Sequence, residues 1–198
     1  MQPAKTISPV EAEPELWSTG YQVVRQILTA PSVARLREHI LLQPVHEMVA
    51  DSQVPETPAK YGDPVMDKLL EALAPTVGSL SGRDVVPTYS YFRIYKNNDS
   101  LARHTDRGAC EISLSLSLGH ESPSPWPLWI QGFKGTVAVE LDAGDAVLYL
   151  GPQCMHWREP FVGQRAIQAF LHYVDSAGRF SEWKYDKRRS LAHHLPQP

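Results

Sequence analysis

The sequence predicts a mainly β fold of the sandwich or jelly-roll type, preceded by helices. Residues 110–118 alternate strictly between apolar and polar side chains, which is the pattern of a β-strand. Short β-like stretches follow one another up to residue 174, and glycine and aspartate separate them. Seventeen prolines among 198 residues also favour a loop-rich β architecture over a helical one.

Two amphipathic helices are expected in the N-terminal part of the chain. The first covers residues 31–42, where Pro31 stands at the first helical position and apolar side chains fall on one stripe. The second starts at Asp63-Pro64, and we expect Pro75 to perturb or end it. Residues 1–85 are therefore predicted to form a helical support layer.

A β core is expected over residues 86–175. It starts with the aromatic-rich run 89–95 and continues with the alternating strand 110–118. Further β-like stretches lie at 128–131, 135–141, 145–149, 153–158 and 165–174. Residues 176–198 then form a C-terminal extension. The chain has the length of one domain and contains no internal repeat, so we expect a single domain over residues 1–198.

The composition argues against several classes of function. The chain is 42% hydrophobic and 21% charged, as in globular proteins. Its net charge of -3 does not suit a nucleic-acid partner, and no apolar run approaches the ~20 residues that would cross a membrane. Two cysteines are too few for a disulfide framework, and no signal-peptide core stands near residue 1. The expected location is therefore cytoplasmic.

The most informative motif is His104-Thr105-Asp106, followed much later by His156. Residues two apart on a strand share a face, so His104 and Asp106 are expected to point at one spot. The intervening chain is long enough to travel around a jelly roll and bring His156 from a facing strand. A His-x-Asp pattern alone recurs by chance. Two imidazoles and one carboxylate on one face of a metal are nevertheless the usual ligands of non-haem Fe(II) oxygenases.

A further candidate is Arg165, which begins the apolar strand after His156. An arginine buried among apolar neighbours needs an anionic partner. A dicarboxylate bound beside the iron would supply that partner through a planar, bidentate pair.

His104-x-Asp106, His156 and Arg165 together resemble the iron(II)/2-oxoglutarate-dependent oxygenases, specifically their prolyl-4-hydroxylase-like branch. The resemblance runs from about residue 89 to 174 and includes Pro160 and the Gly-x-Arg at 163–165. It implies a double-stranded β-helix with Fe(II) held by the two histidines and the aspartate. It also implies 2-oxoglutarate on the iron with its far carboxylate on Arg165, O2 as the oxidant, and ascorbate in support.

The resemblance extends to Tyr95, which matches a tyrosine that contacts the co-substrate in that branch. The strand after His-x-Asp, however, lacks the tyrosine that often helps to hold the far carboxylate, and Ser115 or Ser117 is expected to replace it. The usual Gly-Gly-Glu-Thr segment is replaced by residues 125–129, so a prolyl substrate is not carried over. Because Asp106 is present, hydroxylation is expected and halogen transfer is not.

The substrate is expected to be a small molecule, such as an amino acid or another metabolite. Four arginines stand near the metal strands, namely Arg93, Arg103, Arg107 and Arg158, and one or two could hold an anionic substrate group. Arg107, next to Asp106, is the first choice among them. Trp126 and Trp129 are candidates for an apolar pocket wall.

Three other hypotheses stay open at this stage. The same chemistry could act on a prolyl or other residue of a protein or peptide. The protein could instead be a cupin-like metal enzyme that does not use 2-oxoglutarate, but Arg165 would then have no assigned function. A jelly-roll binding module without enzymatic activity would make the His-x-Asp motif incidental.

Overall fold

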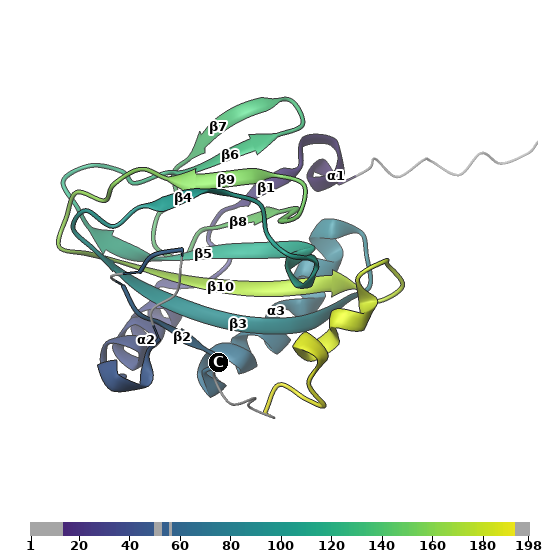
Figure 1. Ribbon diagram of the computed structural model, residues 1–198, viewed down its shortest axis with the longest axis horizontal. Helices are drawn as coiled ribbons and strands as arrows, with labels where there is room; N and C mark the ends of the chain where they lie inside the picture. Colours follow the sequence, from purple (N-terminus) through teal and green to yellow (C-terminus); the bar gives the residue numbers. More distant parts are fainter. Residues whose placement is uncertain (1–13, 50–52, 56, 193–198) are drawn as a thin grey trace, which may run out of the picture.

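Two antiparallel β-sheets packed face to face form the centre of the protein. The structure is a computed structural model that describes residues 14–49, 53–55 and 57–192. The larger sheet has the strand order β1-β8-β5-β10-β3-β2 and the smaller sheet the order β4-β9-β6-β7. Figure 1 shows the smaller sheet above the larger one, with α2 and α3 beyond the larger sheet.

The strands have the following bounds. The larger sheet contains β1 (Tyr21–Val24), β2 (Ala59–Tyr61), β3 (Val85–Lys96), β5 (Ile112–Glu121), β8 (Ala146–Tyr149) and β10 (Arg165–Asp175). The smaller sheet contains β4 (Leu101–His104), β6 (Leu128–Gly132), β7 (Gly135–Val139) and β9 (Met155–Arg158). Every β-like stretch predicted beyond residue 85 overlaps one of these strands. The prediction of a mainly β fold with N-terminal helices is confirmed.

Three α-helices precede the β core: α1 (Glu15–Thr19), α2 (Ala30–Leu41) and α3 (Pro64–Ser81). The side chain of Asp63 caps α3 by accepting hydrogen bonds from the backbone N–H groups of Val65 and Met66. Pro75 was expected to perturb or end this helix; it does not end it, because α3 continues to Ser81. Its apolar face, which includes Leu70 and Val77, packs in the same core as the larger sheet.

Residues 14–85 also contribute strands, which the sequence analysis missed. β1 pairs with β8 at one edge of the larger sheet, and β2 pairs with β3 at the other edge. The N-terminal part is therefore not a purely helical layer. With four and three residues, the two strands are too short for an alternating pattern to identify them as it identifies β5.

The centre of the larger sheet, β5 and β10, is buried on both faces. Ile112, Leu114, Leu116 and Leu118 share one core with the buried side chains of α2 and α3. The alternate residues Ser113, Ser115 and Ser117 are also buried and point towards the smaller sheet. The metal-ligand candidates lie on this second side.

The C-terminal extension packs beside β3 through η3 (Ser181–Lys187), which consists of two short 3-10 segments with a kink between them. Its Asp186 reaches the loop after β4, where Arg107 donates two hydrogen bonds to the carboxylate. Tyr61 on β2 donates a further hydrogen bond to Asp186. In the described part of the chain no helix is both long enough and apolar enough to cross a membrane.

Candidate metal centre

His104, Asp106 and His156 come together in space, as the sequence analysis expected. His104 at the end of β4 pairs directly with His156 on β9, and the two ring centres lie 4.3 Å apart. The Nε2 atoms of His104 and His156 lie 3.4 and 3.6 Å from Oδ1 of Asp106. Each of the three residues offers one ligand atom, and these atoms lie within 4.8 Å of one another.

Backbone carbonyl groups orient both imidazole rings. Nδ1 of His104 lies 2.8 Å from the carbonyl oxygen of Ala102, and Nδ1 of His156 lies 3.0 Å from that of Cys154. A carbonyl oxygen can only accept, so Nδ1 carries the proton in each ring. Nε2 of each ring then faces Asp106 and is the atom that would coordinate a metal once it carries no proton.

Asp106 is not on the strand with His104, contrary to the argument from alternation. β4 ends at His104, and Asp106 lies in the loop that follows. Its backbone N–H donates to the carbonyl oxygen of Gly151, 3.0 Å away. Oδ2 accepts long hydrogen bonds from the hydroxyl groups of Ser113 (3.5 Å) and Tyr149 (3.4 Å). These contacts from β5 and β8 hold the carboxylate in place.

Gly151 makes the position of the Asp106 carboxylate possible. A Cβ atom at residue 151 would lie 2.7 Å from Oδ2 of Asp106 and would also meet the carbonyl oxygen of Cys110. Only glycine lets the chain before β9 approach the carboxylate so closely.

The protonation states of Asp106 and His156 suit metal binding. At His104, burial acts to lower the pKa, but the hydrogen bonds with Asp106 and Ala102 outweigh it and raise the pKa, so a metal would have to displace a proton there. Burial acts to raise the pKa of the Asp106 carboxyl group, but the hydrogen bond with His104 and the charges of nearby histidines outweigh it, and the pKa lies below its usual value. Burial is the main cause that lowers the pKa of His156. An ionised carboxylate and a neutral imidazole are the forms that coordinate a metal.

Asp106, Cys110 and His172 form a second group of potential ligands that shares the same carboxylate. Burial raises the pKa of the Cys110 thiol far above its ordinary value, so a metal would bind there only by displacing a strongly held proton. The first group is therefore the better metal centre.

His172 was given no function in the sequence analysis, yet it lies close to the centre. Its Nδ1 is 2.9 Å from the Ser113 hydroxyl, which also contacts Asp106, and its Nε2 is buried without a partner. Its position in the alternation of β10 places it on the same face as Phe170, which packs between the sheets. The two-residue spacing between Phe170 and His172 is the signal in the sequence that could have identified His172.

The burial expected for Arg165 is wrong. Its side chain is 42% exposed, and Nε lies 2.9 Å from Oε1 of Glu121 at the end of β5. By alternation it shares a face with Ile167, whose side chain belongs to the core on the helix side of the sheet. Arg165 as the residue that binds 2-oxoglutarate therefore stays a prediction without geometric support.

A different arginine, Arg158 on β9, is buried between the sheets with 3% of its surface exposed. One guanidinium nitrogen donates to the backbone oxygen of Trp126 at 2.7 Å, and the other to Oε1 of Gln168 at 3.4 Å. The guanidinium group also lies over the Trp126 ring. Burial lowers the pKa of Arg158 to about 10, which leaves it cationic at neutral pH.

The two other residues expected at the co-substrate also lie on the inner side. Tyr95 is buried and meets the Trp126 ring edge-on at 4.9 Å. Ser117 is buried opposite Gln168, and its hydroxyl accepts a hydrogen bond from the Gly119 N–H. Their contacts with a co-substrate stay predictions.

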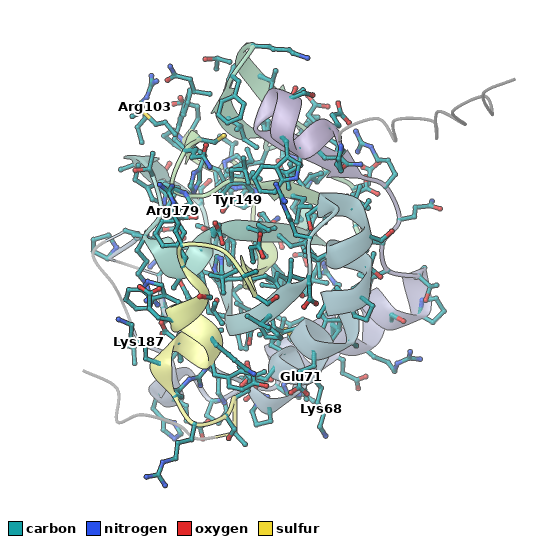
Figure 2. All side chains as sticks on the ribbon, turned by 90° about the vertical axis from the view of Figure 1, so that its right-hand side faces the viewer. Lys68, Glu71, Arg103, Tyr149, Arg179 and Lys187 are labelled. Atoms are coloured by element: carbon teal, nitrogen blue, oxygen red, sulfur yellow. The ribbon has the colours of Figure 1, made fainter. Side chains whose placement is uncertain are left out.

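Nothing in the surroundings of the two residues chosen for the substrate supports that role, and their contacts with a substrate stay predictions. Arg107 makes a bidentate ion pair with Asp186, which holds its guanidinium against the C-terminal extension. Trp129 pairs with Trp157 and stacks on it, on the face of the smaller sheet opposite His156. Arg103 covers Trp157 on that outer face. Figure 2 shows Arg103 at the periphery, whereas Tyr149 lies inside the molecule.

Comparisons with known proteins identify the fold. No family profile and no curated protein matches the sequence. SnoN from nogalamycin biosynthesis, a non-haem alpha-ketoglutarate (2-oxoglutarate) dependent epimerase, superposes with a TM-score of 0.69 at 15% identity, over 81% of this chain and 78% of that one. A Pseudomonas putida prolyl-4-hydroxylase gives 0.66 at 19% identity, over 81% and 95% of the two chains.

The structure of EctD from S. alaskensis with 2-oxoglutarate and 5-hydroxyectoine gives a TM-score of 0.68 at 20% identity, over 93% of this chain and 85% of that one. At these identities the likeness shows the fold alone. The predicted double-stranded β-helix is confirmed, and so is the resemblance to the iron/2-oxoglutarate oxygenases, including the prolyl-4-hydroxylase-like branch, at the level of fold.

Proposed function

We propose that the protein is an Fe(II)- and 2-oxoglutarate-dependent oxygenase that hydroxylates a C–H bond of a small molecule. The observation that carries the proposal is the group of His104, Asp106 and His156, with both Nε2 atoms turned towards the carboxylate. Two imidazoles and one carboxylate are the donor set that Fe(II) accepts while open positions remain for co-substrate and O2.

Bound Fe(II) and 2-oxoglutarate would supply the oxidation of the substrate by O2, with succinate and CO2 as the other products. The protein would hold the ligands in fixed orientations. Ala102 and Cys154 keep the imidazole protons on Nδ1, and Ser113 and Tyr149 hold the carboxylate. Asp106 would occupy the ligand position that a halide needs, which supports hydroxylation.

Two observations support a small substrate. His156 is buried and His104 and Asp106 are partly buried, so the centre is not an exposed surface that a folded protein could approach directly. Among the proteins of the same fold, SnoN has been solved with Fe3+, alpha-ketoglutarate and nogalamycin RO, and EctD with 5-hydroxyectoine. The likeness to a prolyl-4-hydroxylase keeps a prolyl residue of a peptide as the second candidate substrate.

The test is succinate formation from 2-oxoglutarate with Fe(II), ascorbate and air, in the presence of amino acids, small organic acids and proline-containing peptides. We expect turnover that is lost in His156→Ala and retained in His46→Ala, because His46 is an exposed histidine away from the centre. A compound that raises the rate would identify the substrate class. No succinate, together with no binding of 2-oxoglutarate to the iron-loaded protein, would instead favour a cupin-like enzyme or a binding module.

A further inference from the structure

We propose that Arg158, and not Arg165, binds the distal carboxylate of 2-oxoglutarate, with the Ser115 hydroxyl as an additional donor on the same inner face. This inference rests on the proposed function and deepens it, because it assigns the co-substrate's second anchor to a residue on the strand of a metal ligand.

The position of Arg158 on β9 is the first argument. It stands two residues after His156, so both side chains point between the two sheets. The rise along a strand separates the two residues by about 7 Å. A five-carbon dicarboxylate that binds a metal at His156 through one end could extend along β9 and reach Arg158 with its other carboxylate.

The second argument is electrostatic. Arg158 is a buried cation, and no carboxylate of the described residues forms an ion pair with it. Its two hydrogen-bond acceptors, the Trp126 carbonyl and the Gln168 amide oxygen, are both neutral, and its Nε is buried without a partner. A buried charge is costly unless an opposite charge compensates it. A bound carboxylate would supply that charge and could accept from the guanidinium.

The surroundings of Arg158 offer a second unused polar group. The Ser115 hydroxyl is buried and has no hydrogen-bond partner. Ser115 lies on the same face of β5 as Ser117, and Ser117 is the cross-strand partner of Gln168, which contacts Arg158. Two orphaned polar atoms on facing strands indicate a place for an anionic ligand rather than a packed apolar core.

Arg165 has none of these properties. It begins β10 opposite Lys96 on one side and Glu121 on the other. Its Nε atom forms an ion pair with Oε1 of Glu121 at 2.9 Å, and the same oxygen forms a second ion pair with the guanidinium of Arg37 at 3.5 Å. Its neighbour Ala166, not Arg165, belongs to the cluster with Tyr95 and Trp126 between the sheets. Arg165 therefore has its anion already and lies on the wrong face.

The test compares two matched variants, Arg158→Gln and Arg165→Gln. Each is loaded with Fe(II) without O2, and binding of 2-oxoglutarate and of 2-oxopentanoate is measured by calorimetry and by the charge-transfer absorbance of the metal complex. 2-Oxopentanoate has the same chain and keto acid end but lacks the distal carboxylate. The ratio of the two affinities therefore reports the distal anchor alone.

We expect the wild-type protein and Arg165→Gln to prefer 2-oxoglutarate by about 100-fold or more, as the loss of a buried charge pair implies. Arg158→Gln should lose this preference while it still binds Fe(II) and 2-oxopentanoate. An unchanged preference in Arg158→Gln, or its loss in Arg165→Gln, would overturn the inference. If the wild-type protein with Fe(II) bound neither compound, the proposed function itself would fail.

A second measurement is independent of how the variants fold. A crystal structure of the wild-type protein with Ni(II) and 2-oxoglutarate should show the distal carboxylate within hydrogen-bond distance of the Arg158 guanidinium. A distal carboxylate on Arg165, or on neither arginine, would contradict the assignment even with the co-substrate bound at the metal.

Discussion

The two faces of the larger sheet are both buried, but their chemistry differs. Towards the helices, β5 presents Leu114 and Leu116 to a continuous apolar core. Towards the smaller sheet it presents Ser113 and Ser115, which meet polar and aromatic side chains and the metal-ligand candidates. Burying polar groups lowers stability unless they are satisfied, and Ser115 is not. The comparison indicates that one face stabilises the fold and the other serves binding and chemistry.

The largest effect is expected on the polar side, from Asp106→Ala. Loss of residues that only orient metal ligands costs about 10–100-fold in metal affinity or activity, so loss of a ligand should cost more than about 100-fold. Succinate formation and bound iron per protein are the measurements, with thermal unfolding as the control for the fold. Full activity in this variant would refute the ligand assignment.

On the apolar side, Leu114→Ala should act on stability alone. Leu114 is fully buried in the core shared with the helices, and such truncations cost about 2–5 kcal/mol in the free energy of unfolding. Urea denaturation measures the loss. Metal affinity of the folded fraction should stay unchanged, and a parallel drop in that affinity would show that the two faces are not separable.

The polar face should also make the stability of the metal-free protein depend on pH. Burial lowers the pKa of His172 to about 4, from an ordinary value of 6.5. Between these values the unfolded chain binds a proton that the folded chain does not, so stability should decrease as pH falls from about 7 to about 4, by about 3 kcal/mol from this residue at most.

The check is urea denaturation of the metal-free protein as a function of pH. His172→Asn should flatten the decrease, whereas the matched substitution His46→Asn at an exposed histidine should leave it unchanged. Equal slopes in the wild-type protein and His172→Asn would mean that His172 titrates normally in the folded state.

Gly151→Ala tests how closely the chain must approach the metal centre. The added methyl group would meet Oδ2 of Asp106 at 2.7 Å and push the carboxylate out of position. We expect a loss of about 10–100-fold in Fe(II) affinity, measured by calorimetry, because the ligand remains present but is displaced. The same substitution at Gly135, where no atom lies within 4 Å of the added Cβ, is the control, although its positive φ costs some stability. Equal Fe(II) affinities in the two variants would contradict the role of Gly151.

The smallest effect on stability is expected for Ser115→Ala, the neighbour of Leu114 on the opposite face. Removal of a buried hydroxyl group without a partner should change the free energy of unfolding by no more than about 1 kcal/mol, and stabilisation is possible. A loss above about 2 kcal/mol would show that the polar face also carries the stability of the sheet.

The sequence by itself determined the mainly β architecture and the residues that meet at the centre. Strict alternation identified β5, because a period of 2 over nine residues is specific to strands. His104, Asp106 and His156 were found from their residue types and spacing, and the structure brings them together. Their coordination of iron stays a prediction. Local patterns are sufficient for β5 because strand formation depends on nearby residues, and the ligands were found because their residue types match the donor set of a known metal site.

The tertiary structure decided which face each side chain occupies. Alternation along β9 and β10 shows that His156 and Arg158 share a face and that Arg165 and Ala166 do not, but it does not say which face meets the metal. That depends on cross-strand register, such as Trp129 with Trp157, and on partners distant in sequence, such as Glu121 for Arg165 and Asp186 for Arg107. Pairing between distant strands sets these relations, and no short segment of the sequence contains them.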